Sequence, residues 1–196
     1  LPPAAATAGI IKMASSAEQT EEKFRVSFGE MAQASLQLAD QLARDQQRAR
    51  VAIQNMMADA QAILAPMTEN REAAAAMSAA LAALAVDLGS FLNLADREAF
   101  DRLISGLLGS TEATERLGIS LRESVLQLEA QRLGIEGNVA SMSDAEKIML
   151  RFSAIMRQST DAQTDAIRTG ASFENQLKAL QADVVTLATE LGQELL

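Results

Sequence analysis

Carboxylates are the main side chains of this sequence that could do chemistry, because the usual catalytic partners are missing. The 196 residues contain no His, Cys, Trp or Tyr. The chain therefore lacks imidazole for proton transfer near neutral pH, thiolate as a nucleophile, and the ligands of zinc and other transition-metal sites. Serine and carboxylate catalysis stay open, but no partner for them stands out. The composition predicts a non-enzymatic protein with no catalytic residue, cofactor or metal ion.

Four carboxylates are close enough in sequence to resemble acid–base pairs, namely Glu21 with Glu22 and Asp96 with Glu98. Functional carboxylates are found where burial and neighbouring charges shift their pKa values. These four lie in strongly polar stretches. The sequence therefore predicts that each pair belongs to a solvated helix face.

Carboxylates alone can still bind Mg²⁺ or Ca²⁺, because these ions accept oxygen ligands only. Such a site needs several acidic groups on one helix face, at spacings of three or four residues. Asp161 and Asp165 have this spacing, but Gln163 between them points elsewhere. We therefore expect no metal site here either.

Two segments could contact phosphate groups, and each lacks part of what that chemistry needs. The segment Gly106–Leu107–Leu108–Gly109–Ser110–Thr111 looks like a phosphate cradle, but it has no Lys and follows a helical pattern rather than a strand. A structural turn is the preferred interpretation. The second segment is a basic run of Arg44, Arg48 and Arg50, flanked by Asp40 and Asp45. It is short and has no interleaved aromatic residues, which nucleic-acid binding surfaces usually contain. With a net charge of −9, we expect no specific nucleic-acid binding.

Helices must carry all of these residues. Aromatic residues make up only 3% of the chain, whereas the abundant Ala, Leu, Met, Gln and Glu are strong helix formers. Neither period-two alternation nor a β-branched run marks a strand. The sequence predicts an all-α fold, in which several helices with heptad-like seams form an elongated bundle or a coiled-coil-like assembly.

Glycine and proline divide the helical pattern into segments. Residues 1–17 are rich in Ala and Pro and are expected to be a linker or a lead-in to a helix. Residues 18–196 form the helical region. Gly29 is a candidate break in the first helical stretch, and Pro66 should end or kink that stretch. Gly109 is placed to stop a later, short helix.

Capping residues mark three predicted helix starts. Asp96 follows a turn and is a predicted N-cap. Ser120 with Glu123, and Ser143 with Glu146, each place a hydroxyl at a helix start and a carboxylate three residues on. This spacing is a capping box, which satisfies two backbone N–H groups.

Two rows of apolar residues, at alternating spacings of three and four, predict helix-packing seams. The sequence leaves open whether they form a core within the chain or a seam between copies of it. The rows are Met77, Leu81, Leu84, Leu88 and Phe91, and then Phe173, Leu177, Leu180, Val184, Leu187 and Leu191.

The segment 73–92, which carries the first row, is also about as long as a membrane-spanning helix of ~20 residues. It is rich in Ala rather than Leu, and it contains Asp87. A charged side chain in hydrocarbon is costly. A buried, helix-facing role is therefore preferred, and membrane insertion is the alternative.

Several blocks of this sequence resemble, in order and spacing, the conserved region of the tail tape measure proteins of tailed phages. The resemblance covers nearly all of the chain from about Glu18 onward. Its clearest blocks are 143–147, 151–156, 159–169 and 172–177, preceded by shorter ones at 84–91, 98–100, 106–112 and 117–119. The residues that match the family pattern are Glu146, Lys147, Arg151, Gln163, Asp165, Arg168, Asn175 and Gln176.

This resemblance implies a structural virion protein and a piece of a longer chain. Tape measure proteins are long helical chains that occupy the lumen of the tail tube, set the tube length during assembly and leave when DNA is ejected. The resemblance implies a homo-oligomer of a few copies, with a trimer as one option. The other implied partners are the tail tube and the distal tail or tail tip proteins. The implied location is the virion tail, after assembly in the host cytoplasm, with membrane contact at ejection only.

Two other functions remain as alternatives. In one, the segment 73–92 inserts into a host membrane at ejection, which a liposome leakage assay would detect. In the other, the chain is an unrelated helical coiled-coil scaffold. A gene position beside tail-tube and distal-tail genes would separate the tape measure from the scaffold.

Overall fold

The computed structural model describes residues 3–68, 70–135 and 137–160. Within these ranges the chain is all-α, as predicted, and its helices pack against one another. The elements are α1 (Pro3–Phe28), η1 (Gly29–Met31), α2 (Ala32–Asp45), α3 (Arg50–Thr68), α4 (Arg71–Leu92), α5 (Asp96–Leu107), α6 (Thr111–Glu115), α7 (Glu123–Arg132), η2 (Val139–Ser141) and α8 (Asp144–Gln158).

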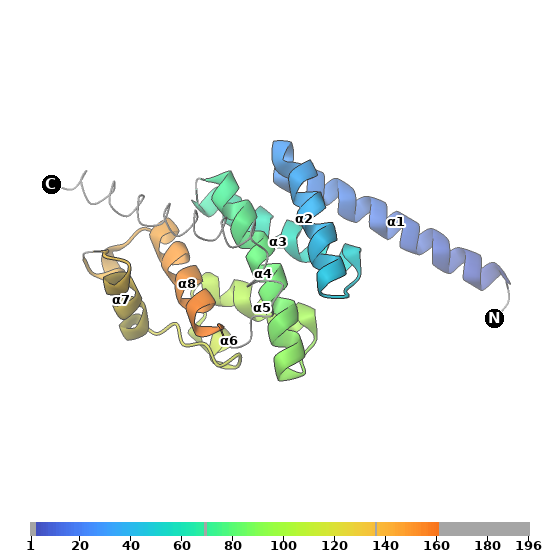
Figure 1. Cartoon of the computed structure of the whole chain (residues 1–196). Helices are drawn as coiled ribbons and strands as arrows, with labels where there is room; N and C mark the ends of the chain where they lie inside the picture. Colours follow the sequence, from blue (N-terminus) through green and yellow to red (C-terminus); the bar gives the residue numbers. More distant parts are fainter. Residues whose placement is uncertain (1–2, 69, 136, 161–196) are drawn as a thin grey trace.

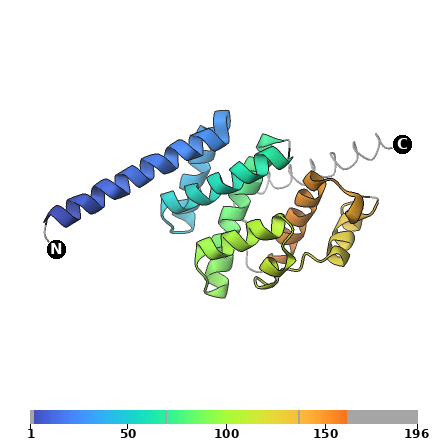
Figure 2. The ribbon, with the colours of Figure 1, turned by 180° about the vertical axis from the view of Figure 1, so that it is seen from behind.

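The helix α4 lies in the middle of the body, between its neighbours in sequence (Figure 1). It packs against α3 and α5 most extensively, and also against α2. Seen from behind, α1, α3 and α5 run side by side across one face of the body (Figure 2). The helix α8 lies against α3, α5 and α7 and so connects the end of the described chain to its middle.

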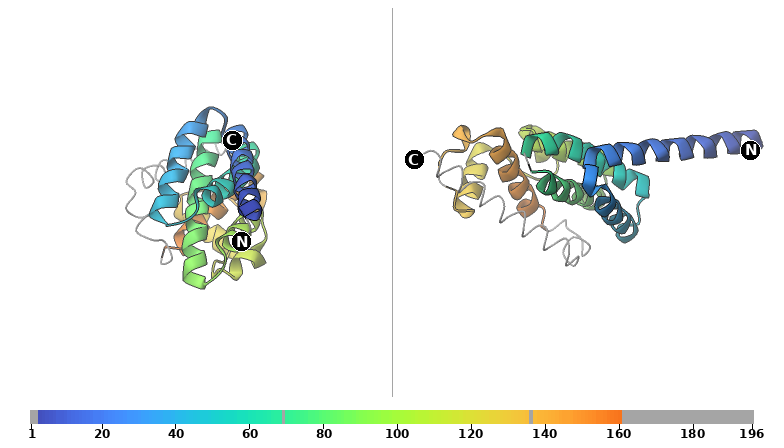
Figure 3. Two further views of the ribbon diagram at one scale, coloured as in Figure 1. Left: turned by 90° about the vertical axis from the view of Figure 1, so that its right-hand side faces the viewer. Right: turned by 90° about the horizontal axis from the view of Figure 1, so that it is seen from above.

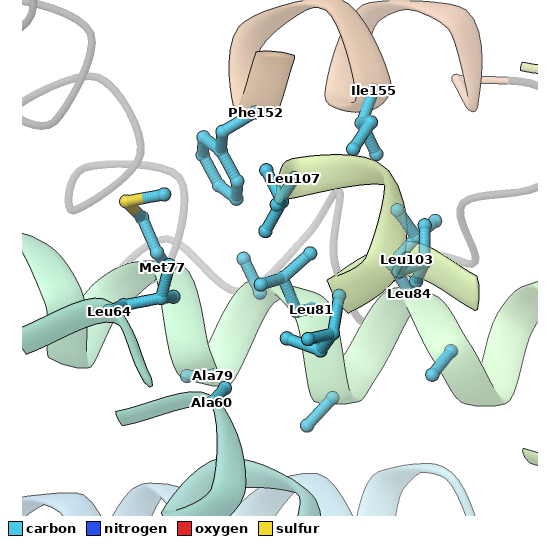
Figure 4. Close-up of a cluster of buried hydrophobic side chains, with 14 of the residues drawn as sticks. Ala60, Leu64, Met77, Ala79, Leu81, Leu84, Leu103, Leu107, Phe152 and Ile155 are labelled. Atoms are coloured by element: carbon cyan, nitrogen blue, oxygen red, sulfur yellow. The ribbon is translucent and has the colours of Figure 1, made fainter. Parts of the chain in front are cut away.

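Small side chains let the helices around α4 approach closely. Every residue from Met77 to Gly89 is buried, so this helix is covered on all sides rather than along one stripe. Seven alanines between Ala73 and Ala85 are at most 3% exposed. Larger side chains from the neighbouring helices fill the space between them. Leu64, Leu103, Leu107 and Phe152 lie in this cluster (Figure 4).

The first helix, α1, joins the body by its C-terminal part only. Phe24 and Phe28 are buried and stacked on each other, with ring centroids 4.2 Å apart. Thr20 donates a hydrogen bond to Asn55 of α3 at 3.2 Å. Ahead of these contacts the helix runs straight out of the body (Figure 3).

Glycine and proline act close to where the sequence placed them, and the Ala/Pro-rich start of the chain belongs to a helix. Helix α1 begins at Pro3, so residues 3–17 are helical and lead directly into the body. Gly29, with φ of 58°, ends α1 as expected. Helix α3 includes Pro66 in its last turn and ends two residues later at Thr68, as expected for a proline that ends a helix.

One of the two predicted capping boxes is present. Ser143 accepts from the N–H of Glu146 at 3.2 Å, and the Glu146 carboxylate accepts from the N–H of Ser143 at 2.6 Å. The box at Ser120 and Glu123 is wrong, because α7 begins at Glu123 after an N-cap at Arg122. The N–H of Ser120 instead donates to Gln158 of α8 at 2.9 Å.

Asp96 is also wrong as an N-cap. The N-cap of α5 is Ala95, and Asp96 is the first residue of the helix. The Asp96 carboxylate turns to Arg48, whose Nε lies 2.6 Å away. A long-range ion pair therefore takes the side chain that the local pattern assigned to the helix end.

The first predicted seam holds for four of its five residues. Met77, Leu81, Leu84 and Leu88 are at most 2% exposed. The prediction is wrong for Phe91. This side chain is 68% exposed in the last turn of α4, beyond the buried stretch that ends at Gly89. The second seam, from Phe173 to Leu191, lies outside the described residues.

Candidate functional site

Three of the eight family-pattern residues lie within the described ranges, and all three are in α8. Glu146 completes the capping box at the start of this helix. Lys147 donates from Nζ to the carbonyl oxygen of Ala140 in η2, at 3.2 Å. Both side chains therefore satisfy backbone groups where the chain enters α8. Gln163, Asp165, Arg168, Asn175 and Gln176 lie outside the described residues.

Arg151, the third, reaches from α8 to the end of α5. Its Nη1 donates to the carbonyl oxygen of Leu107 at 3.0 Å. Partial burial lowers the pKa of the guanidinium, while the charge of Asp144 acts in the opposite direction. A cation at a helix C-terminus satisfies free carbonyl groups and interacts favourably with the helix dipole. Arg151 is thus a cap that α8 supplies to α5.

The glycine-rich segment from Gly106 to Thr111 is the turn against which Arg151 packs. A Cβ on Gly106 would come within 2.1 Å of the Thr114 side chain, so this glycine lets α6 approach α5. Gly109 has φ of 111°, and a Cβ there would lie 3.4 Å from Nη2 of Arg151.

Two amides of this turn are already bonded to carbonyl groups at the end of α5. The N–H of Gly109 donates to Gly106 and that of Ser110 donates to Ser105, at 3.0 and 2.9 Å. A phosphate cradle needs such N–H groups free to face the ligand. The segment is therefore a structural turn, in agreement with the preferred interpretation of the sequence.

Three of the four carboxylates that resembled acid–base pairs have an arginine as partner instead of one another. Glu98 accepts from Arg102 at 2.7 Å, and Glu21 accepts from Arg25 at 2.7 Å, both one helical turn apart. Asp96 accepts from Arg48. Glu22 is exposed. Glu21, Glu22 and Glu98 fit the solvated helix face that the polar sequence context favoured, whereas Asp96 forms an interhelical ion pair.

The short basic run is divided among different contacts. Arg48 bonds Asp96 and also donates to Ser90 at 3.1 Å, so it ties the turn between α2 and α3 to the end of α4 and the start of α5. The bond to Asp96 raises the pKa of Arg48. Arg50 is 2.7 Å from Asp40 of α2. Arg44 is exposed. The three arginines do not form a single basic surface.

A buried carboxylate that the sequence did not single out connects α7 to α8. Glu129 is 1% exposed. It accepts hydrogen bonds from Arg132 at 2.7 Å, from Ser153 at 2.6 Å and from Arg157 at 2.7 Å. Burial acts to raise the pKa of Glu129, but these three donors outweigh it and lower the pKa to about 2. The carboxylate is therefore held ionised, which suits a structural anchor and not a proton donor.

A second carboxylate, Asp59 of α3, joins α1 to α5. It accepts from Lys23 of α1 and, at 2.5 Å, from Arg97 of α5. Burial raises the pKa of Asp59 in part, but the two cations lower it overall. Arg97 also bonds Asp101 at 2.9 Å and lies over the ring of Phe100.

The Asp59 cluster borders an open groove of about 510 Å³ between α1, α3 and α5. Ala62, Ile63, Phe100 and Ile104 contribute its apolar part. The charged side chains at its edge already bond one another. Nothing in its lining pairs a nucleophile with a base, so the groove offers space but no assembled chemistry.

Two further predictions concern metal binding and membrane insertion. In the part of the chain that the structure describes, no group of three or more Asp or Glu side chains could hold a metal ion. Asp161 and Asp165 lie outside that part.

Helix α4 is long and apolar enough to cross a membrane. Its most apolar 18 residues have a mean hydropathy of 1.7, but 72% of this stretch is buried inside the protein. A place in the core accounts for its hydropathy.

Sequence reasoning missed Glu129 and Asp59 because each is a single acid on an ordinary helical pattern. Their partners Arg157 and Lys23 are 28 and 36 residues away in sequence. Only the Arg132 partner, at a spacing of three residues, was visible locally.

Comparison with known proteins adds no family to this geometry. No family model, no curated protein and no solved structure matches the chain.

Proposed function

We propose that this chain is a structural assembly protein without catalytic activity, and that it is the conserved helical region of a phage tail tape measure protein. The observation that carries the proposal is the series of sequence blocks, in the family's order and spacing, from about Glu18 to Leu177. The protein sets the length of the tail tube during assembly. It occupies the lumen, in a few copies that contact tube and distal tail proteins, until DNA is ejected.

The contacts of the described residues support a structural role. The family-pattern residues Glu146, Lys147 and Arg151 all bond backbone groups at the ends of helices or turns. Two carboxylates, the partly buried Asp59 and the buried Glu129, hold helices together through arginine and lysine. These polar residues are thus engaged in packing.

Tail length in the phage that encodes this chain tests the proposal. In-frame deletions in the parent protein, outside the 196 residues of this region, should shorten the tail by about 1.5 Å per deleted helical residue. Electron microscopy of purified virions measures the length, and deletions of equal size in another virion gene serve as the control. Tails that keep their full length after several such deletions would sink the proposal.

The position of the gene is a second, independent check. A tape measure gene is expected beside genes for the tail tube and the distal tail. A locus without tail genes would favour the unrelated scaffold instead.

A further inference from the structure

The folding of α1 to α8 into one body determines which residues can contribute to tail length. We infer that residues 20–160 form a head of fixed size, whose residue count does not enter the measured length. Of the described elements, only the projecting part of α1 adds length along the tail axis. This inference rests on the proposed function, since a fixed head has meaning only in a protein that measures.

Contacts between residues far apart in sequence hold the head together. Thr20 bonds Asn55, and Lys23 bonds Asp59, so α1 is fixed to α3. Arg48 bonds Asp96 across 48 residues. These contacts prevent the chain from extending while the body is folded.

Two further contacts close the other end of the body. Gln158 bonds both the N–H and the carbonyl oxygen of Ser120, at 2.9 and 2.8 Å. Arg157 bonds Glu129 at 2.7 Å. The last described helix therefore returns to the body instead of continuing an axis.

The difference in length between the two arrangements is large. A continuous helix of about 140 residues would be about 210 Å long, because each residue adds about 1.5 Å. A compact folded domain of that size has a radius of gyration of about 14 Å, which corresponds to a diameter of roughly 36 Å. Adding residues to a turn of such a domain changes its surface and leaves its end-to-end length nearly constant.

The projecting part of α1 behaves differently, because it is one straight helix. It leaves the body ahead of Thr20 and points away from it (Figure 3). An insertion there moves everything on its far side outward by about 1.5 Å per residue.

Two insertions with the same number of residues separate these behaviours. The first places about 56 residues of helix-forming heptads between Ser15 and Ser16, which adds about 84 Å of helix. The second places a Gly/Ser-rich segment of the same length after Gly118, an exposed turn with open space around it. A flexible loop there is tolerated, because the cost of closing a loop grows slowly with its length.

We expect tails longer by about 84 Å, to the nearest whole ring of the tube, from the first insertion, and tails of normal length from the second. Equal lengthening by both would overturn the inference while leaving the measuring function intact. No lengthening by the α1 insertion would also overturn it, and the deletions elsewhere in the parent protein then show separately whether the chain measures at all.

Folding of the altered chains is checked on purified protein by circular dichroism and thermal unfolding. If the Gly118 insertion gives no tails, the same segment is placed after Gln47, an exposed residue between α2 and α3. Tail length is then measured for that insertion in its place. Lengthening from that site would count against the inference as well.

Discussion

Single carboxylates in this protein hold helices together through ion pairs, and Glu129 is the clearest case. A buried ionised group is tolerated only when its hydrogen bonds replace those of water. Three donors surround Glu129, and its two arginine partners keep about half of their own side-chain surface exposed. The charge is therefore compensated by cations that remain partly hydrated.

Replacement of this carboxylate should destabilise the body. We expect Glu129→Gln to lower the free energy of unfolding by about 2 kcal/mol, because the amide cannot accept from three donors and carries no charge for the arginines. Urea denaturation followed by circular dichroism measures the change. Glu123→Gln, at an exposed site of the same helix, is the matched control and should change stability by less than about 0.5 kcal/mol. Equal effects of the two variants would contradict the anchoring role.

The pH dependence of stability follows from the same group. The pKa of Glu129 falls from an ordinary value of 4.5 to about 2 in the folded protein. A depressed pKa stabilises the fold above the unfolded value and loses that stabilisation as pH falls toward the folded value. The stability difference between the wild type and Glu129→Gln should therefore shrink as the pH falls from about 4.5 to about 2. A difference that stays constant over this range would show that ionisation of Glu129 does not contribute.

Helix ends show how far an element can be read from local sequence. The two serine boxes have the same pattern, and only Ser143 caps a helix. At Ser120, Gln158 takes up the backbone groups from a distance of 38 residues. Asp96 fails as a cap for a similar reason, because Arg48 takes its carboxylate. Local patterns thus locate the helices well, but tertiary partners decide which side chains close their ends.

The two serines provide a matched pair of substitutions. Ser143→Ala should lower the free energy of unfolding by about 1 kcal/mol, the usual value of an N-cap hydroxyl. Ser120→Ala should change it by less than about 0.5 kcal/mol, because α7 does not begin with this side chain. Thermal unfolding of the two variants under the same conditions compares them. A larger loss from Ser120→Ala would mean that α7 starts at the predicted box after all.

For the molecule as a whole, the composition and the three-four spacing of apolar residues were enough to predict an all-α fold. They also predicted the burial of Met77, Leu81, Leu84 and Leu88. They were not enough to predict the arrangement. The three-four spacing indicates one apolar stripe, whereas α4 is buried on all sides from Met77 to Gly89. Its many alanines conceal this, since Ala is compatible with both a surface and a core. The contacts of α8 with α3 and α5 have no local signal at all.

The central position of α4 leads to a prediction for membranes. The folded protein should not release dye from liposomes, because the apolar surface of α4 already faces other helices. Leakage should be measured at neutral pH, first on native protein and then after heating above the unfolding transition. Release by the native protein at the lower temperature would favour the membrane-active alternative over a structural role.

The position of α8 also has a consequence for the order of events during synthesis. Most helices in this body pack against a neighbour in sequence, so each pair can form soon after its second helix leaves the ribosome. The surface of α3 and α5 that α8 covers is completed last, when Phe152 and Ile155 join the cluster around Leu107 (Figure 4). That surface stays open to solvent until α8, which ends at Gln158, has been made. A nascent chain stalled before α8 would therefore be the species most prone to aggregate or to recruit a chaperone.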